Sequence, residues 1–509
     1  MEYVIGCDVG SQAVKAILLT AEGQMVAECG ADYAIQYPRP TWAEQDANDW
    51  IAALTKAIHG LLKESGASPD QIRAIGLDAQ VDGLVPVDAS GAPLRPAIIW
   101  MDRRATAQVE RIRERCDPAR VFQISGLNLD PYHVAPKIRW VADHQPEIFD
   151  QAHRFLLPGS FVANWLTGQL AVDYSNASST LLMDVRTKEW SPELCRLFEI
   201  PIDRLVPIHP ATAVLGGLLP DIAQTLGLSP HTRVVLGCGD EHAACLGAGV
   251  VEPGLVCDIT GTAEPIGAAS AHLHFDETGL VETHCHAHPD LWLLENPGFV
   301  SGGTYRWFRD QMGQEEVGRA AQTGADAYEL LDQAAQTVPP GSDGLIMLPC
   351  LMGAMTPTWN PQARGTFMGF TLTHEKRHFA RAILEASAYA LRDITDRMQG
   401  MGLGLGEIRA VGGGARSPLW RQIKADVTGL PVTLLHTVET TALGAGLLAL
   451  VGAGFVGSLE EAVELAVRVV ETRQPDPAAQ AQYESYYQLY RETYFTLLPV
   501  FNRAARMKA

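Results

Sequence analysis

The sequence has no long apolar run, no basic cluster and no paired cysteine motif. No stretch approaches the ~18 uncharged apolar residues that a membrane-spanning helix needs, so we expect no transmembrane segment. Near the N-terminus Glu2, Asp8 and Lys15 interrupt the apolar residues and no basic segment precedes them, which argues against a signal peptide. The nine cysteines are scattered without a CxxC pair, as in proteins that keep their thiols reduced. We therefore expect a soluble, cytoplasmic protein.

Positive charge is also scarce. The 509 residues contain 39 Lys+Arg against 59 Asp+Glu, a formal net charge of −20, and no stripe of Lys and Arg occurs. Because nucleic-acid binding depends on basic side chains that neutralise phosphates, this balance argues against DNA or RNA as a partner. With 47% hydrophobic and 19% charged residues the chain is typical of a folded globular protein, and its length allows more than one domain.

The order of apolar patterns predicts an α/β fold. Two apolar runs in Tyr3–Thr20, separated by an Asp/Gly/Ser turn, and a third at Gln24–Glu28 indicate a β-meander. Helical spacing follows at 46–65, and a buried strand is predicted at Ile72–Leu77. The alternation of strand and helix continues through a strand expected at Ile98–Asp102.

The second half of the chain repeats this organisation. A strand predicted at Leu255–Thr260 ends in a Gly/Thr/Ala turn, a long helix is predicted at His378–Met398, and a strand at Glu407–Val411 precedes three glycines. Ala244–Val251 also resembles Thr441–Leu448 in residue type and order. Both copies carry small residues at helical spacing, namely Ala244, Gly247 and Ala248, and Ala442, Ala445 and Gly446. We interpret the repeat as two similar domains joined at a close helix crossing that acts as a pivot, in preference to tight core packing alone.

Several turns could hold phosphate groups. Asp8-Val-Gly10-Ser11 ends a predicted strand, and the backbone N–H groups of such a turn can bind a phosphate while a hard cation prefers the carboxylate. Gly261-Thr262-Ala263 is a second such turn, and the glycines at 412–414 allow the backbone to approach a flat or phosphorylated ligand. Taken singly, each pattern also fits an ordinary turn or loop.

Asp240 lies at the predicted start of a helix, in the segment Gly237–His242. An aspartate there can be a helix cap, which contributes about 0.5–2 kcal/mol. It can equally be a general base presented at the mouth of a cleft between the two halves. Both interpretations stay open at this point.

Histidines are concentrated in one segment of seventeen positions, where the cluster consists of His272, His274, His284, Cys285, His286 and His288. The HxH spacing is compatible with a transition-metal site. On a hairpin, however, alternate residues share one face and histidines are often ordinary surface residues. We favour this structural interpretation.

Taken together and in this order, the motifs resemble those of the FGGY carbohydrate kinases. The segments DVGSQAVK, GCGDEHAACLGAG, DITGTAE, VGGGARS and TALGAG are similar to the phosphate 1, connect 1, phosphate 2, adenosine and connect 2 segments of the actin-like ATPase fold. Five further segments look like this family and, overall, like its xylulose-kinase branch: TWAEQDANDW (41–50), IIWMDRRA (98–105), DPYHVAPKIRW (130–140), NPQARGTFMGFTL (360–372) and HFARAILEASAYALRD (378–393). The resemblance spans nearly the whole chain.

The resemblance implies two RNase H-like domains of the actin-like ATPase fold with an interdomain catalytic cleft. The N-terminal domain would comprise residues 1–248, and the C-terminal domain residues 249–509. The aromatic residues of the helix-rich end of the second, at 478–507, are spaced for packing, although the sequence does not tell which domain they cover.

The resemblance also implies ATP and Mg²⁺ as cofactors and assigns residue roles. Asp240 corresponds to the base that takes the proton from a sugar hydroxyl as it attacks the γ-phosphate, and Asp8 to the carboxylate associated with Mg²⁺. The residues implied in ATP binding are Gly10, Ser11, Gln12, Lys15, Gly261, Thr262, Gly303, Gly413, Gly414, Ala415 and Ser417. The family carries no metal that the histidine cluster would bind.

The implied sugar-binding residues are Gln80, Val81, Asp82, Asp102, Tyr132, Asp240 and Glu241. Val81-Asp82 departs from the family, in which xylulose kinases carry Met-His and glycerol kinases Arg-Glu. Asp82 can accept hydrogen bonds from hydroxyls, whereas Val81 has no side-chain donor. Tyr132 resembles the glycerol-kinase pocket, and Glu241 replaces the usual Asn or Gln. We expect a ketopentose such as D-xylulose, phosphorylated to its 5-phosphate, with a linear polyol as the alternative.

A different class of function also stays open. A non-catalytic actin-like ATP-binding protein, either a filament former or a sugar sensor, would share the fold, but it would not require a base at Asp240. The expected partners are therefore a small sugar or polyol and ATP, with no nucleic acid and no membrane. A homodimer is common in the family, although no feature of this sequence demands one.

Overall fold

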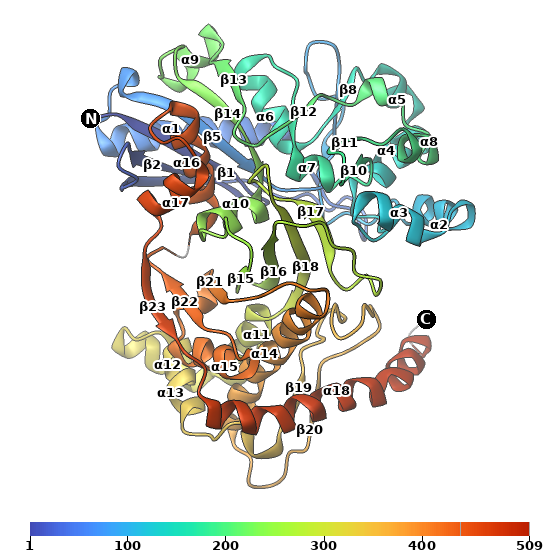
Figure 1. Cartoon of the computed structure of the whole chain (residues 1–509), viewed down its shortest axis with the longest axis vertical. Helices are drawn as coiled ribbons and strands as arrows, with labels where there is room; N and C mark the ends of the chain where they lie inside the picture. Colours follow the sequence, from blue (N-terminus) through green and yellow to red (C-terminus); the bar gives the residue numbers. More distant parts are fainter. Residues whose placement is uncertain (438, 508–509) are drawn as a thin grey trace.

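The computed structural model of the chain describes residues 1–437 and 439–507 and consists of two α/β halves stacked along the long axis (Figure 1). The first half is built on a six-stranded sheet of order β13-β14-β5-β1-β2-β3. Its strands are β1 (Tyr3–Val9), β2 (Ala13–Thr20), β3 (Met25–Asp32), β5 (Ile72–Ala79), β13 (Val214–Gly217) and β14 (Arg233–Gly239).

The second half contains a seven-stranded sheet of order β17-β18-β16-β15-β21-β22-β23. Its strands are β15 (Leu255–Ile259), β16 (Ala263–Ser270), β17 (Glu282–Cys285), β18 (Trp292–Val300), β21 (Glu407–Val411), β22 (Val432–Leu435) and β23 (Val469–Arg473). The strands predicted from the sequence at 72–77, 255–260 and 407–411 are all present.

The two sheets share one topology. In the first, β1 pairs antiparallel with β2 and parallel with β5, which in turn is parallel to β14. In the second, β15 pairs antiparallel with β16 and parallel with β21, which is parallel to β22. The internal repeat predicted from the sequence is thus confirmed as two similarly built halves.

Helices cover both sheets. In the first half they are α1 (Ala47–Ser65), α2 (Thr106–Arg115), α3 (Pro118–Ser125), α4 (Val134–His144), α5 (Pro146–Gln151), α6 (Pro158–Thr167), α7 (Tyr174–Ser178), α8 (Pro192–Leu197) and α9 (Pro220–Leu226). In the second they include α11 (Gly302–Met312), α12 (Gln314–Thr323), α13 (Ala327–Gln336), α14 (Lys376–Gly400), α15 (Pro418–Thr428) and α17 (Leu459–Ala466). Short paired strands complete the fold: β4 (Glu44–Gln45), β6 (Val85–Val87), β7 (Ala97–Ile98), β8 (Arg154–Leu156), β9 (Val172–Asp173), β10 (Met183–Asp184), β11 (Glu189–Trp190), β12 (Ile208–His209), β19 (Ile346–Leu348) and β20 (Thr366–Met368).

The strand expected at Ile98–Asp102 is wrong. Only Ala97–Ile98 is extended, as β7 paired with β4, and the chain then turns at Trp100 and Met101. The turn forms because the Asp102 carboxylate accepts hydrogen bonds from the backbone N–H groups of Ala43 and Arg104, which holds the segment away from a ladder.

Two helices made of small residues meet between the halves. α10 (Asp240–Gly247) packs on α16 (Thr440–Ala453), and α16 also lies against β1 and β5 of the first sheet (Figure 1). A Cβ at Gly247 would lie 1.9 Å from Thr440 O, and one at Gly444 would lie 2.0 Å from Ala243 O, so glycine is required at both positions. The predicted close crossing is confirmed. The other face of α16 packs on the first sheet, where a Cβ at Gly6 or Gly76 would strike its backbone.

The last helix, α18 (Pro477–Arg506), belongs to the second half. Its aromatic side chains pack with α14, α15 and β19, and the buried ones are Tyr483, Tyr487, Tyr490, Tyr494 and Phe501. Tyr483 Oη donates a hydrogen bond to Glu385 and accepts one from Arg381. The aromatic spacing noted in the sequence is therefore explained by core packing.

Candidate active site

Three carboxylates lie at one edge of the first sheet. Asp8 on β1 is directly opposite Asp78 on the parallel strand β5. The next parallel strand, β14, ends at Gly239, opposite Ala79, and Asp240 follows as the first residue of α10. Because the carboxyl ends of parallel strands share one edge, this is where an open α/β sheet binds its ligands.

Burial raises the pKa of all three carboxyls, and the charge of Asp8 raises the pKa of Asp240 and of Asp78 further. Desolvation raises the pKa of Asp240 to about 7, with the negative charge of Asp8 adding to it. Desolvation likewise raises the pKa of Asp8 to about 6. Asp78 is completely buried, and burial followed by the charge of Asp8 holds its pKa well above the usual range. Asp78 therefore keeps its proton.

The second sheet neutralises its corresponding charge. Asp258 on β15 lies 2.5 Å from Lys424 Nζ, and the same ammonium lies 3.0 Å from Glu264. In the first sheet the ammonium of Lys15 is paired with Glu439 instead. Its positive charge therefore acts on Asp8 from a distance, without a direct ion pair. The first sheet edge thus keeps carboxylate oxygens for a cation, whereas the second holds an internal ammonium in that place.

The first of the turns that we expect to bind phosphate connects β1 and β2. Gly10 N–H donates to Ala13 O at 3.1 Å, and a Cβ at Gly10 would lie 3.4 Å from the Asp8 carboxylate. The Ser11 hydroxyl accepts a hydrogen bond of 2.8 Å from Trp100 Nε1. Gln12 beside it is exposed.

The second phosphate turn and the glycine-rich turn meet at the end of β15. Gly303 N–H donates to Thr262 O at 3.0 Å, and Gly261 N–H donates to Ala263 O at 3.0 Å. Gly414 N–H donates to Thr260 O at 3.0 Å, so the segment with Gly413 and Ala415 lies beside this turn. Ser417 instead caps α15, since its Oγ accepts a hydrogen bond from Trp420 N–H.

The residues that the sequence assigned to the sugar differ in their contacts. The backbone N–H of Val81 donates to the Asp240 carboxylate. Asp82 has φ of 55° and accepts a hydrogen bond of 3.0 Å from Ser179 Oγ. Tyr132 Oη donates to Glu282 at 3.0 Å, and Glu241 has a buried oxygen without a partner among the described residues.

Two expected sugar ligands contact other protein groups, although one buried oxygen of Gln80 has no hydrogen-bond partner among the described residues. Gln80 is fully buried, and its amide donates to Gln45 Oε1 at 2.8 Å. Asp102 is also fully buried, and both of its oxygens accept hydrogen bonds from the Arg104 guanidinium. These contacts hold the loops around the site in place.

Sequence reasoning missed three residues of the site. Asp78 lies near the end of an otherwise apolar strand. It follows an apolar run, as Asp8 does, and this shared position was the signal in the sequence. Trp100 contacts Ser11, and Glu282 contacts Tyr132, but each pair comes from distant segments, so local patterns carry no signal for them.

The histidine cluster does not share one face. His272 is exposed, but His284, Cys285 and His286 are buried, so the interpretation as surface residues is wrong for these. His288 pairs with Glu460. The hairpin bearing the cluster belongs to the second sheet but packs against the first half, where Cys285 joins the main core.

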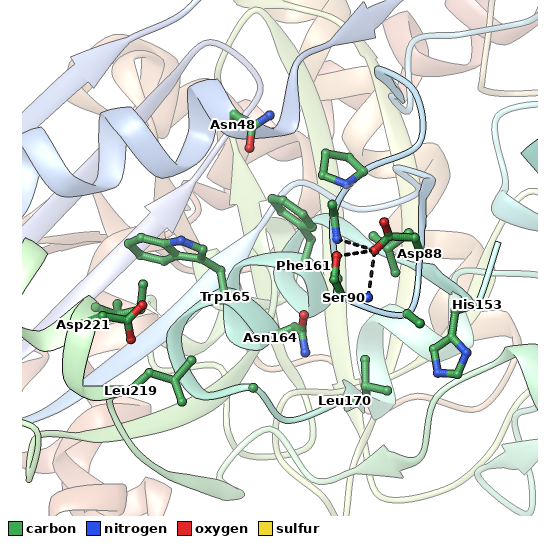
Figure 2. Close-up of a pocket in the computed structure, with 17 residues that line it drawn as sticks. Asn48, Asp88, Ser90, His153, Phe161, Asn164, Trp165, Leu170, Leu219 and Asp221 are labelled. Carbon is green, nitrogen blue, oxygen red and sulfur yellow. Dashed lines mark hydrogen bonds between the residues drawn. The ribbon is translucent and has the colours of Figure 1, made fainter. Parts of the chain in front are cut away.

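The first half also has a hollow of about 490 Å³, away from the sheet edge that carries the three carboxylates. It is lined by the loop 88–93 and by Phe161, Asn164 and Trp165 of α6 (Figure 2). In this loop the Asp88 carboxylate accepts hydrogen bonds from Ser90 and from Ala92 N–H. Because the hollow contains none of the three carboxylates, we place the active site at the sheet edge.

Two further features bear on membrane spans and cysteines. Among residues 1–437 and 439–507, no helix is long and apolar enough to cross a membrane. All nine cysteines are free thiols.

Comparison with known proteins identifies two matching domains. Residues 3–247 match the N-terminal domain, and residues 259–453 the C-terminal domain, of the FGGY family of carbohydrate kinases. The chain is 32% identical to a xylulose kinase of Escherichia coli over 97% of this chain and 99% of that protein. It is 30% identical to a gluconokinase of Bacillus subtilis (99% and 96%) and 32% identical to a glycerol kinase of Nitratidesulfovibrio vulgaris (90% and 92%). The crystal structure of xylulose kinase from Rhodospirillum rubrum superposes with a TM-score of 0.90 at 30% identity, covering 98% of this chain and 100% of that one.

Proposed function

The chain belongs to the FGGY family of carbohydrate kinases, and from that premise we propose that it phosphorylates a ketopentose such as D-xylulose to its 5-phosphate. ATP is the phosphoryl donor of these sugar kinases. The observation that carries the proposal is Asp240, a carboxylate with a pKa of about 7 that lies beside Asp8 and the first phosphate turn.

Asp240 is suited to act as the general base. A base works best when its pKa lies near the working pH, so a carboxyl at about 7 accepts a proton far better than an exposed aspartate. The Val81 N–H and the Glu241 N–H both donate to this carboxylate and fix its orientation. In this role Asp240 takes the proton of the sugar hydroxyl while that oxygen attacks the γ-phosphate.

The residues present fit a magnesium ion next to the phosphates. One buried oxygen of Asp8 has no hydrogen-bond partner in the described part of the chain, and carboxylate oxygens are ligands that Mg²⁺ prefers. Asp8 would hold the ion, directly or through water, and the protonated Asp78 opposite it would add no further charge. The ion would neutralise charge on the phosphate oxygens.

Backbone groups explain how an acidic protein binds ATP. The turns at Gly10–Ser11 and Gly261–Thr262 present N–H groups rather than basic side chains, and the glycines at 413–414 leave room for the adenosine. Positioning of the two substrates and neutralisation of charge supply most of the catalysis in phosphoryl transfer.

A linear polyol is the second candidate substrate. Val81 leaves the pocket without the donor that a glycerol-kinase arginine supplies, whereas Asp82 and Tyr132 resemble the glycerol-kinase pattern. The similarity to a glycerol kinase at 32% identity supports keeping this alternative. The xylulose kinase relatives and the overall resemblance favour the ketopentose.

A coupled ADP-release assay across pentuloses, hexuloses and polyols tests the proposal. We expect turnover with D-xylulose and a loss of about 10²–10⁴-fold in Asp240→Asn, since that is the range of general-base catalysis, with ATP affinity retained. Asp221→Asn is the matched control, because Asp221 also lies in the first turn of a helix but is exposed and outside the site. Activity on polyols alone would select the alternative substrate. Sugar-independent ADP release, or near-normal turnover of Asp240→Asn, would contradict the mechanism.

A further inference from the structure

A second polar cluster lies behind the catalytic aspartate. It consists of His242 on the first turn of α10, His284 on β17 and Glu295 on β18. The three side chains are 1%, 4% and 7% exposed, and one potential ligand atom from each lies within 4.8 Å of those of the other two. The first turn of α10 and the β17–β18 hairpin thus bring three potential metal ligands to one buried point.

The imidazoles in this cluster lack hydrogen-bond partners. Neither ring nitrogen of His242 nor of His284 has one among the described residues, and one buried oxygen of Glu241 is also unpartnered. Buried polar groups are normally satisfied, because each one left unpaired costs about 1–3 kcal/mol. Four unpartnered ring nitrogens in one place therefore indicate a ligand.

The geometry agrees with a shared cation better than with a direct hydrogen bond. His284 Nε2 lies 3.5 Å from Glu295 Oε2, whereas a charge-assisted hydrogen bond spans about 2.7–2.9 Å. Two ligands each about 2.0–2.1 Å from a tetrahedral ion lie roughly 3.3–3.4 Å apart. The His242 and His284 rings are 5.6 Å apart at 74°, so they approach the point from different directions.

The charges around the cluster also favour a cation. Within the described residues, the ion-pair contacts of Glu282 and Glu295 are with His284. Buried carboxylates need a cation or a proton. A divalent ion would supply this charge, whereas a neutral sugar would not.

From these observations we propose that His242, His284 and Glu295 bind a divalent transition metal of the zinc type, with water or Glu241 as the fourth ligand. Imidazole nitrogens favour zinc over magnesium, so this site is distinct from the Asp8 site. The metal would fasten the β17–β18 hairpin to the turn that carries Asp240. Of the histidine cluster at residues 272–288, only His284 takes part in this site. The other histidine of the site, His242, comes from another segment.

Elemental analysis of the full-length protein tests the proposal. Purified without an affinity tag, supplied with Zn²⁺ and then dialysed, it should retain about one zinc per chain. Cobalt in place of zinc should give the visible absorption of a tetrahedral Co²⁺ site. Removal of the metal by dipicolinate should lower Tm, and zinc should restore it.

Isosteric variants separate the metal from other roles. His242→Gln, His284→Gln and Glu295→Gln should each lower metal affinity by about 10–100-fold or more, and their Tm should no longer respond to zinc. His286→Gln is the control, since His286 is buried on the same hairpin but outside the cluster, and it should retain the metal. Variants that fail to fold are replaced by titration of the wild type with Co²⁺, which needs no substitution.

Two results would overturn the proposal. One is wild-type protein that, after zinc supplementation, holds no stoichiometric metal and gives no cobalt spectrum. The other is a set of variants that raise the KM for the sugar without any change in metal content, which would make the cluster part of the sugar pocket. The first result does not depend on the kinase assay, so it tests the metal separately from the proposed function.

Discussion

At the scale of single residues, the protonation of Asp240, Asp8 and Asp78 controls the site. The three carboxyls share one sheet edge, and their burial leaves them with fewer charges than three exposed aspartates would carry. Burial keeps Asp78 protonated, so it adds no negative charge beside Asp8.

The rate of the reaction should therefore depend on pH in a defined direction. Because Asp240 must be ionised to accept a proton and its pKa is about 7, kcat/KM should fall about tenfold per unit below pH 7 and level off above it. The measurement is kcat/KM between pH 5 and 9 with excess Mg²⁺, which keeps the nucleotide as one species. A profile that is flat from pH 5 to 8 would contradict this assignment.

Asp78→Asn should stabilise the protein at neutral pH. The raised pKa of Asp78 means that its contribution to stability is fully present below the unfolded pKa of about 3.9 and is lost as pH rises. Asparagine keeps the neutral shape and removes this loss, so Tm at pH 8 should rise by roughly 2–4 °C, the shift that about 1 kcal/mol produces in a domain of this size.

The same comparison near pH 4 should show little difference between Asp78→Asn and the wild type. Asp150→Asn, at an exposed position, should leave Tm unchanged at both pH values. An Asp78→Asn protein that is less stable than the wild type at pH 8 would show that the carboxyl is charged and paired.

Individual site residues could be predicted from the sequence only where they belong to a recognisable local pattern. Asp8 and Asp240 follow apolar strands and precede a glycine turn or a helix, and such positions are visible in the sequence. Asp102 is also an aspartate, but its carboxylate accepts hydrogen bonds from Arg104 and Ala43. Only the folded loop reveals these contacts. The meeting of His242 with His284 depends on the register of β17 against β18 and is not encoded locally.

At the scale of elements, the crossing of α10 and α16 depends on glycine. The repeat in the sequence was sufficient to predict a close approach, but not which residues form it. Gly444 lies outside both small-residue triplets, while Ala445 and Gly446 face the first sheet instead. Because a helix of small residues has no polar face, its sequence does not show which side packs against which neighbour.

Gly444→Ala should destabilise the protein by about 1–3 kcal/mol, since the added methyl would lie 2.0 Å from Ala243 O and the two backbones would have to separate. Gly318→Ala in α12 is the matched control. No atom lies within 4 Å of its Cβ position, so alanine there should stabilise by about 0.5–1 kcal/mol through helix propensity. Urea unfolding of both variants is the measurement, and equal effects of the two substitutions would contradict a tight crossing.

At the scale of the whole molecule, the arrangement predicts closure around the substrates. The two halves meet through α10 and α16, and a cleft that closes excludes the water that competes with the sugar as acceptor. Asp240→Asn allows the test, because it should bind MgATP and sugar together without reaction.

Small-angle scattering should show a radius of gyration that falls by a few per cent from a value of roughly 23 Å when both substrates are present. Either substrate alone serves as the control and should give a smaller change. An unchanged radius in the ternary complex would show that the crossing does not act as a pivot.

The packing of α16 on the first sheet also has a consequence for synthesis of the chain. Val4, Ile17 and Leu19 of that sheet are covered by Leu443 and Leu447 of α16, which the ribosome makes roughly 200 residues after β14 is complete. At about 5–20 residues per second, this interval lasts on the order of 10–40 s. During it the first half exists as a nascent chain with one apolar sheet face uncovered, so its folding finishes only when the second half is nearly made. Expression of residues 1–248 alone would leave that face permanently exposed.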